Sequence, residues 1–410
     1  MKINIKRLMQ EIEYYAQFGQ VLGEGITRPS FSHGDYEVRE IFMNELEKMG
    51  LEVHVDAIAN IWGKLPCERE DASTIVIGSH LDTVPNGGEF DGALGVLVAK
   101  EIVQTLLENH IKLNHHLEIV SFTAEEPNDF NLSTMGSRAL TGKLTHSQLM
   151  NTSDSTSFKL SEAVKKAGGD LDGISEIKRD DLAAYIELHI EQGKRLEKQN
   201  LSIGIVNQIV GIYRDHIQVS GEANHSGTTM MLDRMDALTA ASEMVLAVEI
   251  VTRSFNTDAV ATVGKLNVFP NAANIIPGRV EFILEIRSAS REERFDIKEA
   301  IYKEFNRIQE SRKVIVKYTN ILDQQECTFD SEIVRYLQHA AHSLNIPYTT
   351  FASMAGHDAT HLAGITKAAM IFVKSINGKS HSPEELSLPE DIEKAANTML
   401  HAVLLADKEI

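Results

Sequence analysis

The sequence has few of the features that mark secreted, membrane-bound or disulfide-rich proteins. Cysteine occurs only twice, at Cys67 and Cys327, so no disulfide framework is expected and a reducing, cytoplasmic location is favoured. No apolar run approaches the 18 residues of a membrane span, and the first 20 residues have the pattern of an amphipathic helix without a secretion signal. We therefore expect no membrane association.

Basic residues are scarce relative to acidic ones. The chain has 40 Lys and Arg against 59 Asp and Glu, and this net charge of -19 disfavours a nucleic-acid partner because it repels phosphate. With 43% hydrophobic and 24% charged residues, the composition excludes a disordered chain. The length of 410 residues exceeds one ordinary core and predicts two or more domains.

The order of apolar runs predicts an α/β domain with an insertion. Short runs at residues 74–78, 117–122 and 184–189 alternate with helical periods, which indicates a central mixed sheet flanked by helices. From residue 213 the order becomes β-α-β-β-α-β, which is typical of a ferredoxin-like α+β unit. We predict a discontinuous catalytic domain of residues 1–212 and 325–410, with an inserted lid or dimerisation domain of residues 213–324.

The first chemically suggestive segment follows the strand predicted at residues 74–78. His80 and Asp82 lie on the same side of an extended chain, so the Asp82 carboxylate can orient the His80 ring while the ring binds a metal. A Gly-rich turn follows and can fold Asp91 back toward His80. Taken alone, this segment is explained better by a solvated turn than by a metal site.

The second segment places Glu125 and Glu126 directly after an apolar strand. Two adjacent carboxylates repel each other unless a cation compensates or one of them is protonated. Pro127 disfavours a helical conformation at Glu126, so the pair lies on a turn where the strand ends. An exposed acidic turn is the alternative.

Two further histidines complete a candidate ligand set. One lies within an apolar strand, where a core histidine is the alternative, and the other follows the last apolar run. The five candidate ligands are His80, Asp91, Glu126, His189 and His381. Imidazoles and carboxylates of this kind predict two divalent ions (Zn, or Mn, Co or Ni) with Asp91 as the bridge and a small anionic substrate. Glu125, left uncoordinated, is then the natural general base.

Eight motifs, in order along the whole chain, resemble those of the M20-type dinuclear metallo-aminoacylases and peptidases. Within this group the chain resembles the hydantoinase/carbamoylase amidases, which include N-carbamoyl-L-amino acid hydrolases and allantoate amidohydrolases. The motifs are GITRPSFS, GSHLDTVPNGGEFDG, EEPNDF with GSRALTG, ELHIEQG, GEANHSG, NIIPGRVEF with EIRS, AGHDA and SHSPEE.

The resemblance implies a zinc-aminopeptidase-like catalytic domain and a homodimer. It gives one ion to His80, Asp91 and His189 and the other to Asp91, Glu126 and His381, with Glu125 as the base and Asp82 beside it. It also implies that His225 stabilises the oxyanion, in this family commonly from the partner subunit. The substrate-binding residues that it implies are Gln192, Asn274, Arg287, Gly356 and His357. For Arg287 the alternative is a surface ion pair with Glu285 or Glu281.

The chain departs from the subfamily pattern near the predicted base. Pro127 and Asp129 replace the usual Gly and Arg, and residues 353–356 read Ser-Met-Ala-Gly before the His-Asp pair. The ligands are unaffected, so the sequence predicts a metal-dependent amidohydrolase of an N-carbamoyl-L-amino acid. The alternatives are an allantoate amidohydrolase, an M20 dipeptidase or aminoacylase, and a non-catalytic dimeric binding protein.

Overall fold

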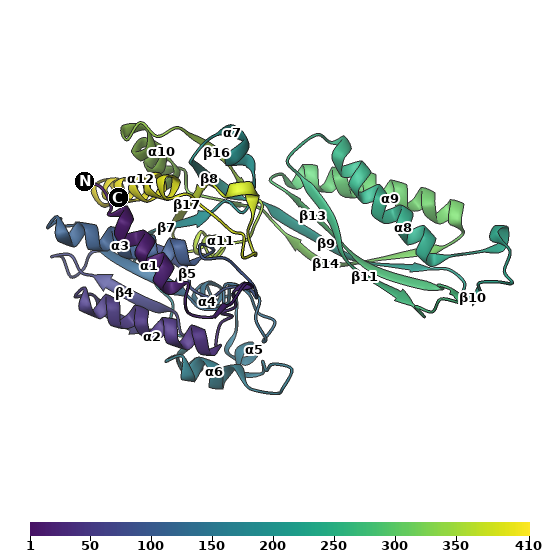
Figure 1. Cartoon of the computed structure of the whole chain (residues 1–410), viewed down its shortest axis with the longest axis horizontal. Coiled ribbons are helices and arrows are strands. Elements are labelled where there is room, and N and C mark those ends of the chain that lie inside the picture. The colour runs from purple at the N-terminus through teal and green to yellow at the C-terminus, as the bar shows by residue number, and fades with distance from the viewer. The chain divides into compact units, whose positions relative to one another are not determined.

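The computed structural model describes residues 1–410, and the chain divides into two compact units (Figure 1). Unit 1 consists of Met1–Asn207 and Thr328–Ile410, and unit 2 of Gln208–Cys327. The chain therefore leaves unit 1 a few residues before position 212 and re-enters it close to position 325. None of its helices combines the length and apolar character needed to cross a membrane.

A nine-stranded mixed sheet forms the centre of unit 1. Its strands are β3 (Glu52–Val55), β4 (Ile61–Leu65), β5 (Thr74–His80), β6 (His116–Phe122), β7 (Leu182–Ile190), β8 (Ile203–Ile209), β15 (Cys327–Thr328), β16 (Tyr348–Ser353) and β17 (Lys367–Val373). The order is β15-β8-β17-β7-β5-β6-β4-β3, with β16 paired to β8. Strands β17, β7, β5 and β6 run parallel to one another. Every residue of β5 and β6 is buried, which is why these strands read as continuous apolar runs in the sequence.

Helices flank this sheet, as the sequence predicts. They are α1 (Ile5–Tyr15), α2 (His33–Lys48), α3 (Ala93–Glu108), α4 (Met135–Leu140), α5 (His146–Met150), α6 (Leu160–Lys166), α7 (Arg195–Gln199), α10 (Ser331–Ser343), α11 (Ala359–Leu362) and α12 (Pro389–Glu409). Helix α3 packs on β5, β6 and β7, helices α10 and α12 pack on β17, and α2 packs on β3 and β4. Short elements complete the unit: β1 (Gln20–Val21), β2 (Gly25–Ile26), η1 (Leu171–Gly173) and η3 (Ile376–Gly378).

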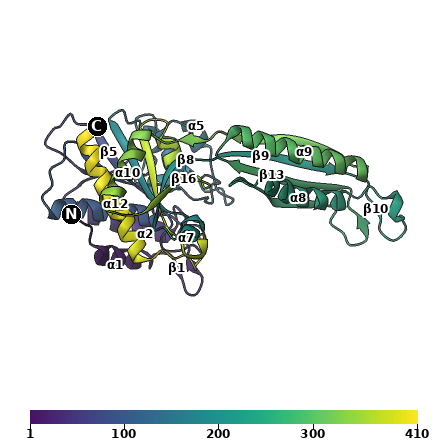
Figure 2. The same ribbon diagram turned by 90° about the horizontal axis from the view of Figure 1, so that it is seen from above.

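Unit 2 contains a four-stranded antiparallel sheet and two long helices. Its strands are β9 (Gly211–Ser220), β11 (Val260–Phe269), β13 (Arg279–Ser288) and β14 (Ile315–Gln324), in the order β11-β13-β9-β14. Helices α8 (Ala237–Ser254) and α9 (Arg291–Arg312) lie side by side on one face of the sheet (Figures 1 and 2). A small ribbon of β10 (Asn224–His225) and β12 (Ile275–Ile276) and a 3-10 turn, η2 (Met231–Asp233), complete the unit.

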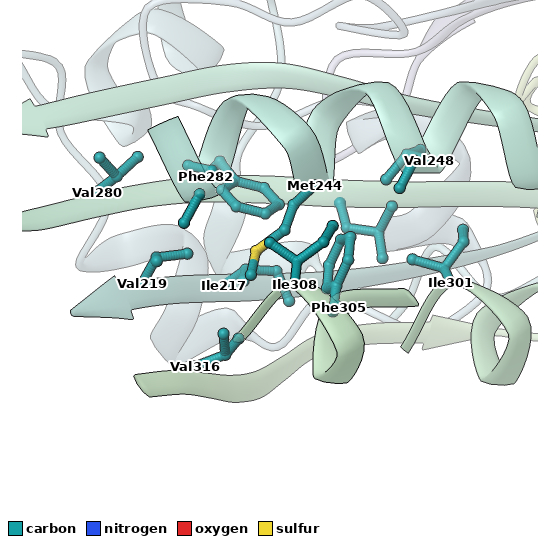
Figure 3. Close-up of a cluster of buried hydrophobic side chains, with 14 of the residues drawn as sticks. Ile217, Val219, Met244, Val248, Val280, Phe282, Ile301, Phe305, Ile308 and Val316 are labelled. Atoms are coloured by element: carbon teal, nitrogen blue, oxygen red, sulfur yellow. The ribbon is translucent and has the colours of Figure 1, made fainter. Parts of the chain in front are cut away.

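The core of unit 2 follows from two periodicities in the sequence. Alternate residues of β13 from Val280 to Ile286 are buried, whereas their neighbours are partly exposed. Helix α9 buries Ile297, Ile301 and Phe305 at steps of four residues, which places them on one helix face. The two apolar surfaces meet between the sheet and the helices (Figure 3).

Candidate metal centre and active site

Four parallel strands end at one edge of the unit 1 sheet, and the candidate ligands lie there. His80 is the last residue of β5, His189 is the last but one of β7, and Glu126 follows the end of β6. The loop after β17 supplies His381. Because the carboxyl ends of parallel strands share an edge, residues far apart in the sequence converge.

Asp91 lies between the histidines with its two oxygens facing different ones. Its Oδ1 is 3.1 Å from His189 Nε2 and 3.8 Å from His80 Nε2, whereas its Oδ2 is 3.3 Å from His381 Nε2. The ring of His80 packs against the backbone of Gly92, where a Cβ atom would lie 2.2 Å from the ring. This close approach of the ring to the residue after Asp91 requires glycine.

Two groups of candidate ligands share Asp91. One consists of His80, Asp91 and His189, and the other of Asp91, Glu126 and His381, with the ligand atoms of each group within 4.8 Å of one another. The first group is buried, whereas the side chain of His381 is 50% exposed. The second group is therefore the one open to solvent.

Glu125 and Glu126 do not form an exposed acidic turn, so that alternative is wrong. Glu126 is buried, and the Glu125 side chain is only 11% exposed, with its Oε2 lying 3.7 Å from His80 Nε2. Burial raises the pKa of Glu125 well above its usual value, and the nearby carboxylates raise it further although His80 opposes them. Glu125 thus lies beside the ligand groups without belonging to either of them.

Asp82 supports this turn in a way that the sequence did not indicate. Its carboxylate accepts the backbone N–H of Glu126 at 3.1 Å and lies 3.4 Å from that of Glu125. The Nδ1 of His80 is 3.0 Å from the backbone carbonyl oxygen of Asp82 but 3.5 Å from its carboxylate. The backbone of Asp82 thus orients the His80 ring, and its side chain holds the Glu125–Glu126 turn.

The electrostatics of the site favour bound cations. Hydrogen bonds to Asp91 and Glu126 raise the pKa of His381 to about 10. Burial lowers the pKa of His80, but the surrounding carboxylates outweigh burial and hold this pKa well above its usual value. The same carboxylates that retain a proton on these imidazoles attract a metal ion, which competes with the proton for the same nitrogen. The donor set, imidazoles and carboxylates sharing one bridge, fits a pair of divalent ions.

Three of the predicted substrate-binding residues lie in unit 1. The amide of Gln192 donates to Asp91 Oδ2 at 2.8 Å and lies 3.4 Å from His381 Nε2, so it borders the second ligand group. His357 is buried with its ring centroid 4.4 Å from that of His189, and Gly356 beside it is exposed. His357 therefore contacts a candidate ligand, and its binding of substrate stays a prediction.

The other predicted residues lie in unit 2, at opposite ends of its sheet. His225 and Asn274 are exposed on and beside the β10–β12 ribbon, where the Ser226 N–H donates to the carbonyl oxygen of Asn274. This ribbon continues from the end of β13 at which Arg279 lies, whereas Arg287 lies at the other end. At about 3.3 Å per residue, Arg287 and Asn274 are roughly 25 Å or more apart in one copy.

Arg287 makes the ion pair that the sequence offered as its alternative role. Its Nε donates to Glu285 Oε1 at 2.7 Å, and Arg214 pairs with the same carboxylate. Burial raises the pKa of Glu285, but the two guanidinium groups outweigh burial and lower it below its usual value. Binding of a substrate carboxylate by Arg287 stays a prediction.

A mixed sheet with two overlapping ligand groups and a carboxylate beside them is typical of metal-dependent hydrolases that use paired ions. The chain belongs to peptidase family M20/M25/M40, whose model matches residues 76–405. The family resemblance predicted from the motifs is thereby confirmed.

The chain is similar over nearly its whole length to several amidohydrolases. The chain is 37% identical over 401 residues to an N-carbamoyl-L-amino acid amidohydrolase of Geobacillus stearothermophilus, covering 97% of each chain. It is 32% identical to an allantoate amidohydrolase of Bacillus subtilis, covering 96% of this chain and 95% of that one. A crystal structure of a hydantoinase/carbamoylase family amidase from Burkholderia multivorans matches with a TM-score of 0.92 and 31% identity, over 100% of this chain and 99% of that one.

Proposed function

We propose that this protein is a metal-dependent amidohydrolase that cleaves the carbamoyl C–N bond of an N-carbamoyl-L-amino acid. The observation that carries the proposal is the position of Glu125, whose side chain is only 11% exposed and lies beside two ligand groups that share Asp91. The similarity over nearly the whole chain to an N-carbamoyl-L-amino acid amidohydrolase supports the choice of bond.

In this proposal one set of side chains binds cations and another side chain transfers a proton. His80, Asp91 and His189 would hold one divalent ion, and Asp91, Glu126 and His381 the other. When bound, such ions polarise a carbonyl group and make water a better nucleophile. Glu125 takes the proton of the attacking water and passes it to the leaving nitrogen. The products are then the amino acid, CO2 and ammonia.

Binding of the substrate carboxylate is proposed for Asn274 and Arg287, and stabilisation of the oxyanion for His225. Because Asn274 and Arg287 are far apart in one copy, one small carboxylate can meet both only if two copies contribute. This supports the predicted homodimer, in which His225 acts on the site of the partner subunit. A cytoplasmic location is part of the proposal and is supported by the two cysteines and the absence of a disulfide framework.

Allantoate is the second candidate substrate. The chain aligns along almost its entire length with the allantoate amidohydrolase of Bacillus subtilis, at lower identity than with the carbamoyl amidohydrolase. Both substrates carry a ureido carbonyl and a carboxylate, so the same ligand groups and base serve either of them.

A substrate panel tests the proposal. Protein loaded with Zn2+, Mn2+ or Co2+ is incubated with N-carbamoyl-L-amino acids, their D enantiomers, allantoate, N-acetyl amino acids and dipeptides, and both ammonia and free amino acid are quantified. We expect ammonia and amino acid in equal amounts from N-carbamoyl-L-amino acids. Ammonia from allantoate alone would establish the second candidate. Turnover of dipeptides or N-acetyl amino acids alone would contradict both candidates.

A further inference from the structure

The Asp91 loop and the His381 loop meet at one buried carboxylate, that of Glu385. Its Oε1 accepts the backbone N–H groups of Phe90 at 2.9 Å and of Asp91 at 3.0 Å. Glu385, Phe90 and Asp91 are all buried, and so are the two hydrogen bonds between them. A buried donor without an acceptor is costly, and Glu385 supplies the acceptor for two of them.

The second oxygen of Glu385 reaches the other loop. Glu385 Oε2 lies 3.2 Å from Ser380 Oγ, and the same hydroxyl lies 2.9 Å from Asp91 Oδ2. Ser380 directly precedes His381, whose φ of 52° is in the left-handed region that a residue with a side chain adopts only with support. Glu385 thus contacts the backbone of the bridging ligand on one side and the residue before the exposed ligand on the other.

The backbone opposite Glu385 is shaped to receive it. A Cβ atom at Gly88 would lie 2.4 Å from both the Cβ and the Oε1 of Glu385, so only glycine leaves room for the carboxylate. The adjacent Glu384 is exposed and pairs with Lys379 instead. Two neighbouring glutamates of one loop therefore have different surroundings, and only Glu385 contacts the candidate metal centre.

We infer that Glu385 is a positioning residue that fixes Asp91 and His381 relative to each other and thereby sets the affinity of the second metal position. The inference rests on the proposed metal centre. Glu385 touches neither ion nor substrate in this role; it acts through the Asp91 backbone and the Ser380 hydroxyl. The second position depends on it most, because Glu385 contacts both Asp91 and the residue that precedes His381. The first position contains only Asp91 of these two ligands.

Metal titration of three proteins tests the inference: wild type, Glu385→Ala and the matched control Glu384→Ala. Each protein is stripped with a chelator, and its binding of Zn2+ is measured by isothermal titration calorimetry, with the stoichiometry checked by elemental analysis. For Glu385→Ala we expect the affinity of one of two ions to fall by about 10- to 100-fold, the range found when outer partners of metal ligands are removed. The Glu384→Ala protein should bind like wild type.

A second variant and a second readout separate positioning from general support of the fold. Gly88→Ala pushes the Glu385 carboxylate away without removing it. This variant should therefore lower the affinity for the same ion, and it can be measured even if Glu385→Ala fails to fold. Glu385→Gln keeps an oxygen that can accept from both N–H groups and should recover most of the affinity. The thermal unfolding temperature of the metal-free proteins is measured in parallel. If Glu385 only supported the fold, its replacement would lower the unfolding temperature and leave the ratio of the two metal affinities unchanged.

The metal titrations distinguish a failure of the role inferred for Glu385 from a failure of the proposed function. Wild-type protein that binds no metal would contradict the proposed function and the inference with it. Wild-type protein that binds two ions, together with unchanged affinities in Gly88→Ala or Glu385→Ala, would overturn the role of Glu385 alone and leave the proposed function standing.

Discussion

Unit 1 brings reactive side chains together from distant parts of the sequence, whereas unit 2 keeps the candidate residues of a short segment apart. Ser380 and Asp91 are 289 residues apart in the sequence, yet their side chains lie 2.9 Å from each other. Asn274 and Arg287 are close in the sequence, but Asn274 lies beyond the first residue of β13 and Arg287 lies near its last. Parallel strands end at a common edge, whereas a long antiparallel strand carries its two ends far apart.

The two units also differ in what they bury. Unit 1 buries several carboxylates near its site, among them Asp35, Asp82 and Asp91, whereas Asp215 and Arg294 are the charged residues buried in unit 2. Unit 2 is held by an apolar core between its sheet and helices. Both ligand groups therefore lie within unit 1, whereas the candidate substrate-binding residues of unit 2 are separated along its sheet.

The largest expected effect concerns Glu125, the proposed base in unit 1. Replacement of Glu125 by Gln keeps the shape of the side chain but removes its ability to take a proton, so kcat should fall by about 10² to 10⁴. Bound metal should be retained, because Glu125 belongs to neither ligand group. Steady-state release of ammonia and elemental analysis measure the two quantities. An undiminished kcat would exclude Glu125 from the reaction, and lost metal would make it a ligand.

A smaller effect concerns the polar interior of unit 1. Burial raises the pKa of Asp35 from 3.8 to about 6, against the opposing effects of Arg39 and the Phe31 N–H. The folded state therefore binds a proton more tightly than the unfolded state. This contribution to stability is fully present below pH 3.8 and is lost as the pH rises through about 6. Asp35→Asn cannot titrate and should lack this dependence.

Urea unfolding at several pH values between 4 and 7 measures the difference. Wild type should lose up to about 3 kcal/mol relative to Asp35→Asn as the pH rises through this range. Glu40→Gln, an exposed position of the same helix, serves as the control and should follow wild type. Parallel curves for wild type and Asp35→Asn would show that Asp35 is not protonated more readily in the folded state.

The smallest expected effect is the recovery of activity in mixed dimers, which tests whether His225 of unit 2 acts at the active site of another copy. Subunits with His225→Ala are mixed, under conditions of subunit exchange, with subunits carrying Glu125→Gln. If His225 acts across a dimer, a mixed dimer has one intact site, and random mixing should restore about a quarter of wild-type activity. If His225 acts within its own subunit, mixing should restore nothing. Light scattering on the same samples reports the oligomeric state.

Much of the fold was predictable because its signals are local. The buried strands β5, β6 and β7 appear as apolar runs, and the alternation in β13 with the four-residue steps in α9 defines the core of unit 2. The candidate ligands were also predictable, because histidines and carboxylates beside strand ends are unusual without a cation. The role of Asp82 was less predictable. Its sequence position shows that it lies near His80, but not that its carboxylate accepts the N–H of Glu126.

Residue type and short-range periodicity were enough to predict the element types, the five candidate ligands and the candidate base. Only the tertiary structure decided that Asp91 faces His189 with one oxygen and His381 with the other, that Gly88 leaves room for Glu385, and that Asn274 and Arg287 do not meet within one copy. These facts depend on the direction and pairing of the strands. Strand pairing brings together residues that are hundreds of positions apart, and local sequence patterns do not show it.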